Sequence, residues 1–120
     1  MNYPVNVVSI HPYFKAHPGQ LAAFKAAMPV FVEKTRAEKD NLYYEFTVNG
    51  DEVFCREACV GAAGALAYLS NVGAELAELL KIATLTRLEI HGPAAELDQL
   101  RGPMARMNPA WFILEAGLRR

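Results

Sequence analysis

The sequence predicts an α+β fold built on one antiparallel sheet. Strand-like and helix-like segments follow one another in the order strand, helix, strand, strand, helix, strand, and a further helix and strand are appended. An Asn-Gly pair between two β-rich runs is the strongest short signal for a hairpin. No repeat or linker divides the 120 residues, so we expect a single domain over residues 1–120. Its core spans about residues 5–91, and residues 92–120 form a C-terminal extension.

The first strand and the first helix are predicted in residues 5–35. Residues 5–16 are rich in Val, Ile, Tyr and Phe, and we expect Pro12 at a bulge or an edge because proline has no N–H for the sheet. Pro18-Gly19-Gln20 then opens a helix, which Pro29 should kink. Its core-facing residues recur at spacings of three and four, namely Leu21, Phe24, Met28, Phe31, Val32 and Thr35.

The hairpin comprises residues 42–48 and 52–60 on either side of Asn49-Gly50-Asp51. Helical pieces follow over residues 62–70 and 74–82, and a strand follows over residues 83–91. A short helical piece carries Leu97, Leu100 and Met104, and the last strand covers residues 111–116. This order is that of the ferredoxin-like split βαβ fold, in which the strands lie 4-1-3-2 and both helices pack on one sheet face.

The second sheet face has no cover of its own in this fold. We expect it to carry Tyr44, Phe46, Cys55 and Cys59, an apolar patch that a monomer does not tolerate. We therefore predict a homodimer whose two sheets pack as a barrel-like sandwich. The last strand is strongly apolar, so it should join a sheet, its own or the partner's, and lock the dimer.

Composition excludes several classes of partner. The chain has 12 Lys+Arg against 13 Asp+Glu and no basic run, so nucleic acid is not an expected partner. Residues 58–74 form the longest uncharged stretch, which is too short and too polar to span a bilayer. Residues 1–9 show no secretory signal, and Cys55 and Cys59 lie about 13 Å apart along one strand, too far for a disulfide. We expect a cytoplasmic protein with free thiols and no membrane contact.

No metal site is predicted. The sequence lacks the common nucleotide-binding, zinc-protease and hydrolase motifs. His11, His17 and His91 lie in separate segments. We expect His11, inside the first strand, and His91, at the far end of the fourth, to be too far apart to share a metal ion.

Glu57 is the first candidate for chemistry. It lies in mid-strand, in phase with Cys55 and Cys59, and a buried carboxylate must be paired, hydrated or raised in pKa. A raised pKa suits a general base. The alternative is a structural ion pair with Arg56, Arg87 or an arginine of a partner.

Other residues have two interpretations each. Tyr44 carries a hydroxyl that needs a hydrogen-bond partner when buried, so it either lines a pocket or has a structural role. Phe46 either lines the wall of that pocket or packs in the core. His11 is a base or an ordinary strand histidine, depending on whether a bulge at Pro12 turns it inward. Trp111 anchors the last strand against a neighbour. Arg87, Glu89 and His91 alternate onto one face of the fourth strand, as a solvated or interface edge.

The segment Glu57-Ala58-Cys59, Ala62, Ala65 and Tyr68-Leu69 resembles the E-x-W-x-x-x-x-A-x-x-x-H-L signature of the antibiotic biosynthesis monooxygenase family. Further matches are Pro18-Gly19-Gln20, Thr35-Arg36-Ala37-Glu38 and Leu42-Tyr43-Tyr44-Glu45-Phe46. The resemblance covers residues 5 to about 91 and implies ferredoxin-like chains that dimerise into an α+β barrel. Cys59 stands where the family usually has Trp, and Tyr68 where it usually has His.

The resemblance implies a cofactor-independent monooxygenase, in which a bound quinol or phenol is deprotonated and its anion reacts with oxygen directly. We assign Glu57 and His11 as candidate bases and Tyr44 and Tyr68 as donors to the oxyanion. The substrate-binding walls are then Phe46, Cys55, Cys59 and Trp111. Because the usual Trp and His are missing, the alternative is a non-enzymatic dimer that binds a small hydrophobic ligand. Isomerisation and lactone rearrangement are further options for a single proton-shuttling carboxylate, whereas haem degradation is disfavoured.

Overall fold

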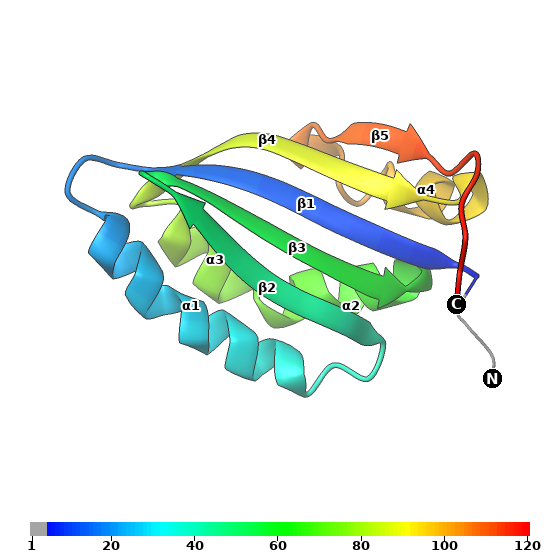
Figure 1. The fold of residues 1–120 in the computed structure, drawn as a ribbon, viewed down its shortest axis with the longest axis horizontal. Helices are drawn as coiled ribbons and strands as arrows, with labels where there is room; N and C mark the ends of the chain where they lie inside the picture. Colours follow the sequence, from blue (N-terminus) through cyan, green and yellow to red (C-terminus); the bar gives the residue numbers. More distant parts are fainter. Residues whose placement is uncertain (1–4) are drawn as a thin grey trace.

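One five-stranded sheet organises the chain, as seen in a computed structural model that describes residues 5–120 (Figure 1). The strands lie in the order β2-β3-β1-β4-β5. The first four are antiparallel to their neighbours, and β5 runs parallel to β4. Their bounds are β1 Val7–Ala16, β2 Asn41–Asn49, β3 Glu52–Val60, β4 Ala83–Gly92 and β5 Ala110–Ile113. The predicted α+β fold and its 4-1-3-2 order are confirmed, with β5 added beside β4.

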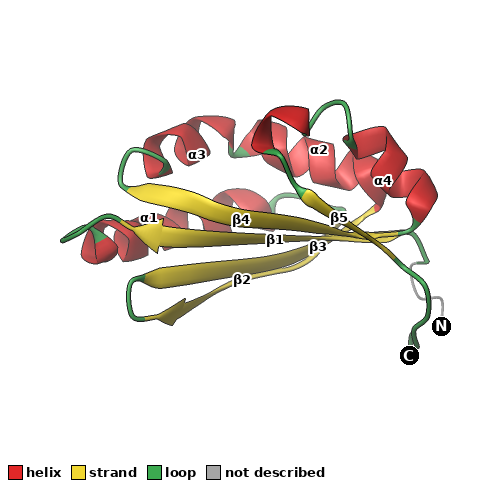
Figure 2. Cartoon of the chain, turned by 90° about the horizontal axis from the view of Figure 1, so that it is seen from above, coloured by secondary structure: helices red, strands yellow, loops and turns green. Residues whose placement is uncertain are grey.

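The helices lie on one face of this sheet and leave the other face open (Figure 2). Their bounds are α1 Leu21–Arg36, α2 Gly61–Asn71, α3 Gly73–Leu79 and α4 Ala94–Leu100, and a 3-10 turn spans Ala105–Met107. Helix α1 continues through Pro29. No helix within residues 5–120 is long and apolar enough to cross a membrane.

The helix-covered face differs from the one predicted. Tyr44 and Phe46 pack against the core beneath the chain's own helices, and Cys55 and Cys59 are almost fully buried there. The prediction that a partner's sheet covers these residues is therefore wrong. Strand alternation fixes which residues share a face, but it does not say which of the two faces the helices cover.

The open face carries polar and aromatic side chains instead. Tyr43 and Phe112 are 45% and 41% exposed on the chain taken alone, and Arg56 stands over the Phe54 ring. Strand β5 pairs with β4 of its own chain, beginning at Glu89↔Ala110, so the described chain places the last strand in its own sheet. That strand is shorter than the predicted residues 111–116.

Two bulges interrupt the strand register. Asn41 pairs with Cys59 and Tyr43 with Ala58, so Leu42 is an extra residue in β2. Pro12 lies in a central strand opposite Leu88, not at an edge, and the bulge near it falls on β4, where Thr86 is the extra residue. The first strand therefore keeps one alternation throughout, and His11 lies on the open face with Ser9 and Tyr13.

Candidate functional site

A small cavity lies between the sheet and the helices, with Glu57 at its polar end. Tyr44 and Glu57 are cross-strand partners on β2 and β3, Phe46 pairs with Cys55 one step along, and Tyr68 descends from α2. The cavity has a volume of about 40 Å³. The rest of its lining is apolar and comes from every layer around it: Ile10, Pro12, Phe14, Phe31, Leu69, Leu76, Leu79, Leu85, Leu88, Met104 and Met107.

The polar groups of this cavity bond to one another. The Tyr44 and Tyr68 hydroxyls lie 2.9 Å apart, which provides the partner that a buried Tyr44 was predicted to need. The Oε2 atom of Glu57 accepts a hydrogen bond from Asn41 Nδ2 at 3.2 Å, and the Cys59 thiol donates to the same oxygen at 3.9 Å.

No cation balances Glu57 among residues 5–120. Its side chain is 1% exposed, whereas Arg56 pairs with Glu45 and Arg87 pairs with Glu89. The structural ion pair considered from the sequence is therefore absent from the described chain. A buried carboxylic acid without a cation favours its neutral form, because the charged form loses its hydration.

Burial governs the proton affinities at this site. It raises the pKa of Glu57 well above the ordinary value, and the hydrogen bonds from Cys59 and Asn41 only partly oppose it. Burial also raises the pKa of Tyr44 and of Tyr68, so both hydroxyls keep their protons and can donate. It raises the pKa of Cys59 to about 12, which leaves that side chain a neutral thiol.

This arrangement suits acid chemistry on a mainly apolar molecule. Glu57, Tyr44 and Tyr68 bring O–H groups to one end of a cavity whose other walls are hydrocarbon. Such groups can polarise or protonate a substrate oxygen. A cavity of about 40 Å³ holds a few waters but falls short of the roughly 150 Å³ that accommodates benzene. A ligand the size of benzene would therefore have to displace lining side chains, and Met104 and Met107 are the most adaptable of them.

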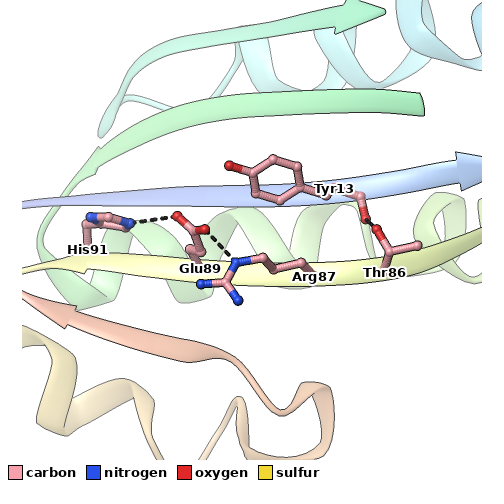
Figure 3. A network of polar contacts seen from close by, with 5 residues as sticks. All are labelled: Tyr13, Thr86, Arg87, Glu89 and His91. Atoms are coloured by element: carbon pink, nitrogen blue, oxygen red, sulfur yellow. Dashed lines mark hydrogen bonds and ion pairs between the residues drawn. The ribbon is translucent and has the colours of Figure 1, made fainter. Parts of the chain in front are cut away.

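His11 lies outside the cavity, on the open face of the sheet. Its Nε2 is 2.8 Å from Ser9 Oγ, and its ring is 4.7 Å from the ring of His91. Burial and the neighbouring His91 lower the pKa of His11, which favours its neutral form. His91 in turn bonds to Glu89 at 3.0 Å, and Glu89 bonds to Arg87 (Figure 3).

The two histidines are thus close together, and the expectation that they are far apart is wrong. The register pairs Ser9 with His91 and His11 with Glu89, which brings both rings to the same part of the sheet. Even so, no three His, Cys, Asp or Glu side chains within residues 5–120 are placed to hold a metal ion together.

The predicted site residues separate into three groups. The first group lines the cavity and comprises Tyr44, Phe46, Cys55, Glu57 and Tyr68. Cys59 does not line the cavity, but its thiol donates a hydrogen bond to Glu57. Trp111 lies on β5, away from the cavity, where Arg101 stands 5.0 Å over its ring. His11 lies on the opposite sheet face.

The sequence did not indicate two parts of the site. Asn41 reaches Glu57 only because of the β2 bulge, which has no signature in a Leu-Tyr-Tyr run. Met104 and Met107 also line the cavity. The sequence indicated Met104 only as part of a short helical piece, and it did not single out Met107.

Among solved structures, this chain is similar to MupZ over nearly the whole length of both chains. MupZ from Pseudomonas fluorescens is 43% identical, with a TM-score of 0.92 over 96% of this chain and 95% of that one. More distant matches show the fold alone. Rv0793 from Mycobacterium tuberculosis is 19% identical, with a TM-score of 0.64 over 72% of this chain and 94% of that one.

A candidate antibiotic biosynthesis monooxygenase from Chloroflexus aurantiacus is 20% identical, with a TM-score of 0.61 over 73% of this chain and 93% of that one. No protein-family model matches the sequence, and no curated protein does.

Proposed function

Because the chain belongs to the family of MupZ and has the fold of antibiotic biosynthesis monooxygenases, we propose that its cavity is the active site of an acid–base enzyme. Glu57 is the group that transfers the proton, and Tyr44 and Tyr68 hydrogen-bond to a substrate oxygen. The substrate is a small, largely apolar molecule with that oxygen at one end. The observation that carries this proposal is the buried Glu57 carboxyl, which has no cation beside it in the part of the chain that the structure describes.

A redox-neutral proton transfer fits this site best. A protonated Glu57 can give its proton to a substrate oxygen, and the carboxylate so formed can take a proton back from a substrate carbon. Isomerisation and lactone rearrangement follow this course. The enzyme ends the cycle with Glu57 protonated again, so no oxidant or reductant is needed.

Cofactor-independent oxygenation of a quinol or phenol is the second candidate, and the fold shared with candidate monooxygenases favours it. It requires Glu57 to start as a carboxylate that deprotonates the substrate. Since burial raises the pKa of Glu57, this activity should increase as the pH rises. The small aromatic substrate would enter beside Phe46 and Cys55.

One experiment separates the two reactions. Purified protein with a chelator is incubated with dihydroxynaphthalenes, benzoquinols, anthrones, and small enones and lactones, with and without oxygen. Oxygen uptake and product masses are recorded in parallel. Products formed without oxygen identify proton transfer, whereas oxygen uptake that scales with protein and survives the chelator identifies oxygenation.

The matched variants are Glu57→Gln and Glu45→Gln. Glu57→Gln should lower kcat/KM by a factor of about 10² to 10⁴, the usual contribution of a general acid or base. Glu45→Gln changes an exposed glutamate of β2 and should leave the rate unchanged. If panel compounds raise the melting temperature but none is converted, the chain is a ligand-binding module and the enzymatic proposal fails.

We also propose a homodimer in which a second copy covers the open sheet face. Near this face Leu42, Phe112 and Ile113 are each more than two fifths exposed on the chain taken alone. They border a groove of about 790 Å³ between the sheet and the C-terminal residues. The free thiols of Cys55 and Cys59 support a reducing compartment such as the cytoplasm.

A further inference from the structure

We propose that Asn41 is a positioning residue that fixes which oxygen of Glu57 carries the proton. The inference rests on the proposed function, since it specifies how Glu57 is held for proton transfer. It stands on the register of β2, on the two donors to Oε2, and on the packing around residue 41.

The β2 bulge directs Asn41 toward Glu57. Tyr43 pairs with Ala58. If the pairing were regular, Leu42 would lie opposite Cys59, and the side chain of Asn41 would lie on the open face. Because Leu42 is extra, Asn41 pairs with Cys59 instead and shares the helix-covered face with Glu57. Bulges commonly re-aim a side chain in this way beside functional sites.

Close packing holds this segment in place. The Val60 amide donates to the Asp40 carbonyl at 2.8 Å. A Cβ atom on Gly64 of α2 would lie 3.0 Å from Asp40 Cβ and 3.2 Å from Cys59 Cβ, so only glycine allows this approach without displacement. Helix α2, the start of β2 and the end of β3 thus converge around Asn41.

Both donors to Glu57 end on the same oxygen. Asn41 Nδ2 and the Cys59 thiol each donate to Oε2, at 3.2 Å and 3.9 Å. In a neutral carboxylic acid, the oxygen that accepts hydrogen bonds is the carbonyl oxygen, and the other oxygen carries the proton. Oε2 is therefore the carbonyl oxygen and Oε1 the acid, ready to donate.

The Asn41 amide sets this orientation more strongly than the thiol does, because S–H is a weak donor. Asn41 also has no charge that could compete for the proton. The titratable groups that act on Glu57 from the surrounding elements are Glu38, Tyr44, Cys55, Cys59 and Tyr68. Burial holds both tyrosines and both cysteines neutral, so none of these four supplies a charge that would direct the proton.

Infrared difference spectroscopy during a pH titration tests this role without a substrate. Glu57→Gln identifies the C=O stretching band of the Glu57 acid. A hydrogen bond to the carbonyl oxygen lowers the frequency of that band, so Asn41→Leu should raise it. The same variant should raise the pH midpoint of Glu57 ionisation by about one unit, because a donor to the carboxylate is lost.

Two further variants complete the test. Thr47→Ala, on the exposed side of the same strand, should leave both the band and the midpoint unchanged. Asn41→Asp keeps the size of the side chain but removes the donor once ionised, and it should raise the midpoint further than Asn41→Leu. If the band and midpoint of Asn41→Leu and Asn41→Asp equal those of the wild-type protein, Asn41 has no positioning role.

This readout is independent of turnover. A Glu57 band that shifts in the Asn41 variants supports the positioning role even if no substrate of the panel is converted. A band that does not shift ends the positioning role even if Glu57 proves essential for a reaction.

Discussion

Within residues 5–120, Glu57 has hydrogen-bond donors but no cation to compensate for its burial. Each donor recovers part of the free energy that the carboxyl group loses on leaving water, and the neutral form loses least. The same low-polarity surroundings keep Tyr44, Tyr68 and both cysteines protonated. The polar groups of the site are therefore all protonated and neutral: one carboxylic acid, two tyrosine hydroxyls and two thiols.

Strand alternation and the family resemblance were enough to single out Glu57, Tyr44 and Tyr68. They could not identify Asn41, because one extra residue in a strand changes the face of everything before it. They could not place His11 either, since its orientation depended on where a bulge near Pro12 would fall. Register depends on long-range pairing, which a local pattern does not contain.

The cysteines give a prediction at this scale. Burial raises the pKa of Cys59 to about 12 and that of Cys55 further still, so neither forms the thiolate that reacts with alkylating reagents. We expect iodoacetamide at about pH 8 to leave both thiols of the folded protein unmodified. In urea both should react, as mass spectrometry would record. Rapid modification of Cys59 in the folded protein would mean that the Glu57 surroundings are open to solvent.

Among the secondary-structure elements, periodicity predicted the strands and helices to within a few residues. The hairpin is the clearest case, because Gly50 adopts the left-handed φ of 63° that an Asn-Gly turn favours. What periodicity could not predict is which sheet face the helices cover. The face that the helices cover depends on the direction of both crossover connections relative to the hairpin. The prediction that a partner's sheet covers Tyr44 and Cys55 was wrong, because the chain's own helices cover them.

Two glycines test the packing of helix α2 against the sheet. Gly64→Ala would force its Cβ against Asp40 and Cys59, and it should reduce the free energy of unfolding by about 1–3 kcal/mol. Gly73→Ala meets nothing within 4 Å at the start of α3, so it should be neutral or stabilising by up to about 1 kcal/mol. Urea unfolding of both variants provides the measurement. Equal effects of the two substitutions would show that α2 does not pack on β3 as described.

For the molecule as a whole, the open sheet face and the C-terminal residues define the surface available to a second copy. Deleting residues 109–120 removes β5 and exposes the edge of β4, together with the apolar surface beneath Trp111. We expect the shortened protein to be monomeric or aggregated in light scattering. Glu33→Gln, an exposed substitution on α1 away from this surface, should leave the dimer intact. A soluble dimer that survives the deletion of residues 109–120 would contradict the proposed role of β5 in holding the assembly.

The stability of the whole protein also depends on the proton of Glu57. The pKa of Glu57 in the folded state lies well above its ordinary value of 4.5, so the folded protein retains a proton that the unfolded chain releases. The free energy of unfolding contributed by Glu57 is therefore fully present below pH 4.5 and is lost as the pH rises through the folded pKa. The slope is at most about 1.4 kcal/mol for each pH unit.

The most direct measurement of the central claim is urea unfolding of the wild-type protein and Glu57→Gln between about pH 5 and pH 8. Gln mimics the neutral acid but cannot ionise, so subtracting the two curves removes the opposite contribution of His11, whose pKa is lowered by burial. We predict that the wild-type protein loses stability relative to Glu57→Gln as the pH rises. If the difference in free energy of unfolding between the two proteins stays constant across this range, Glu57 is not a buried neutral acid. That result would contradict the proposed acid–base site.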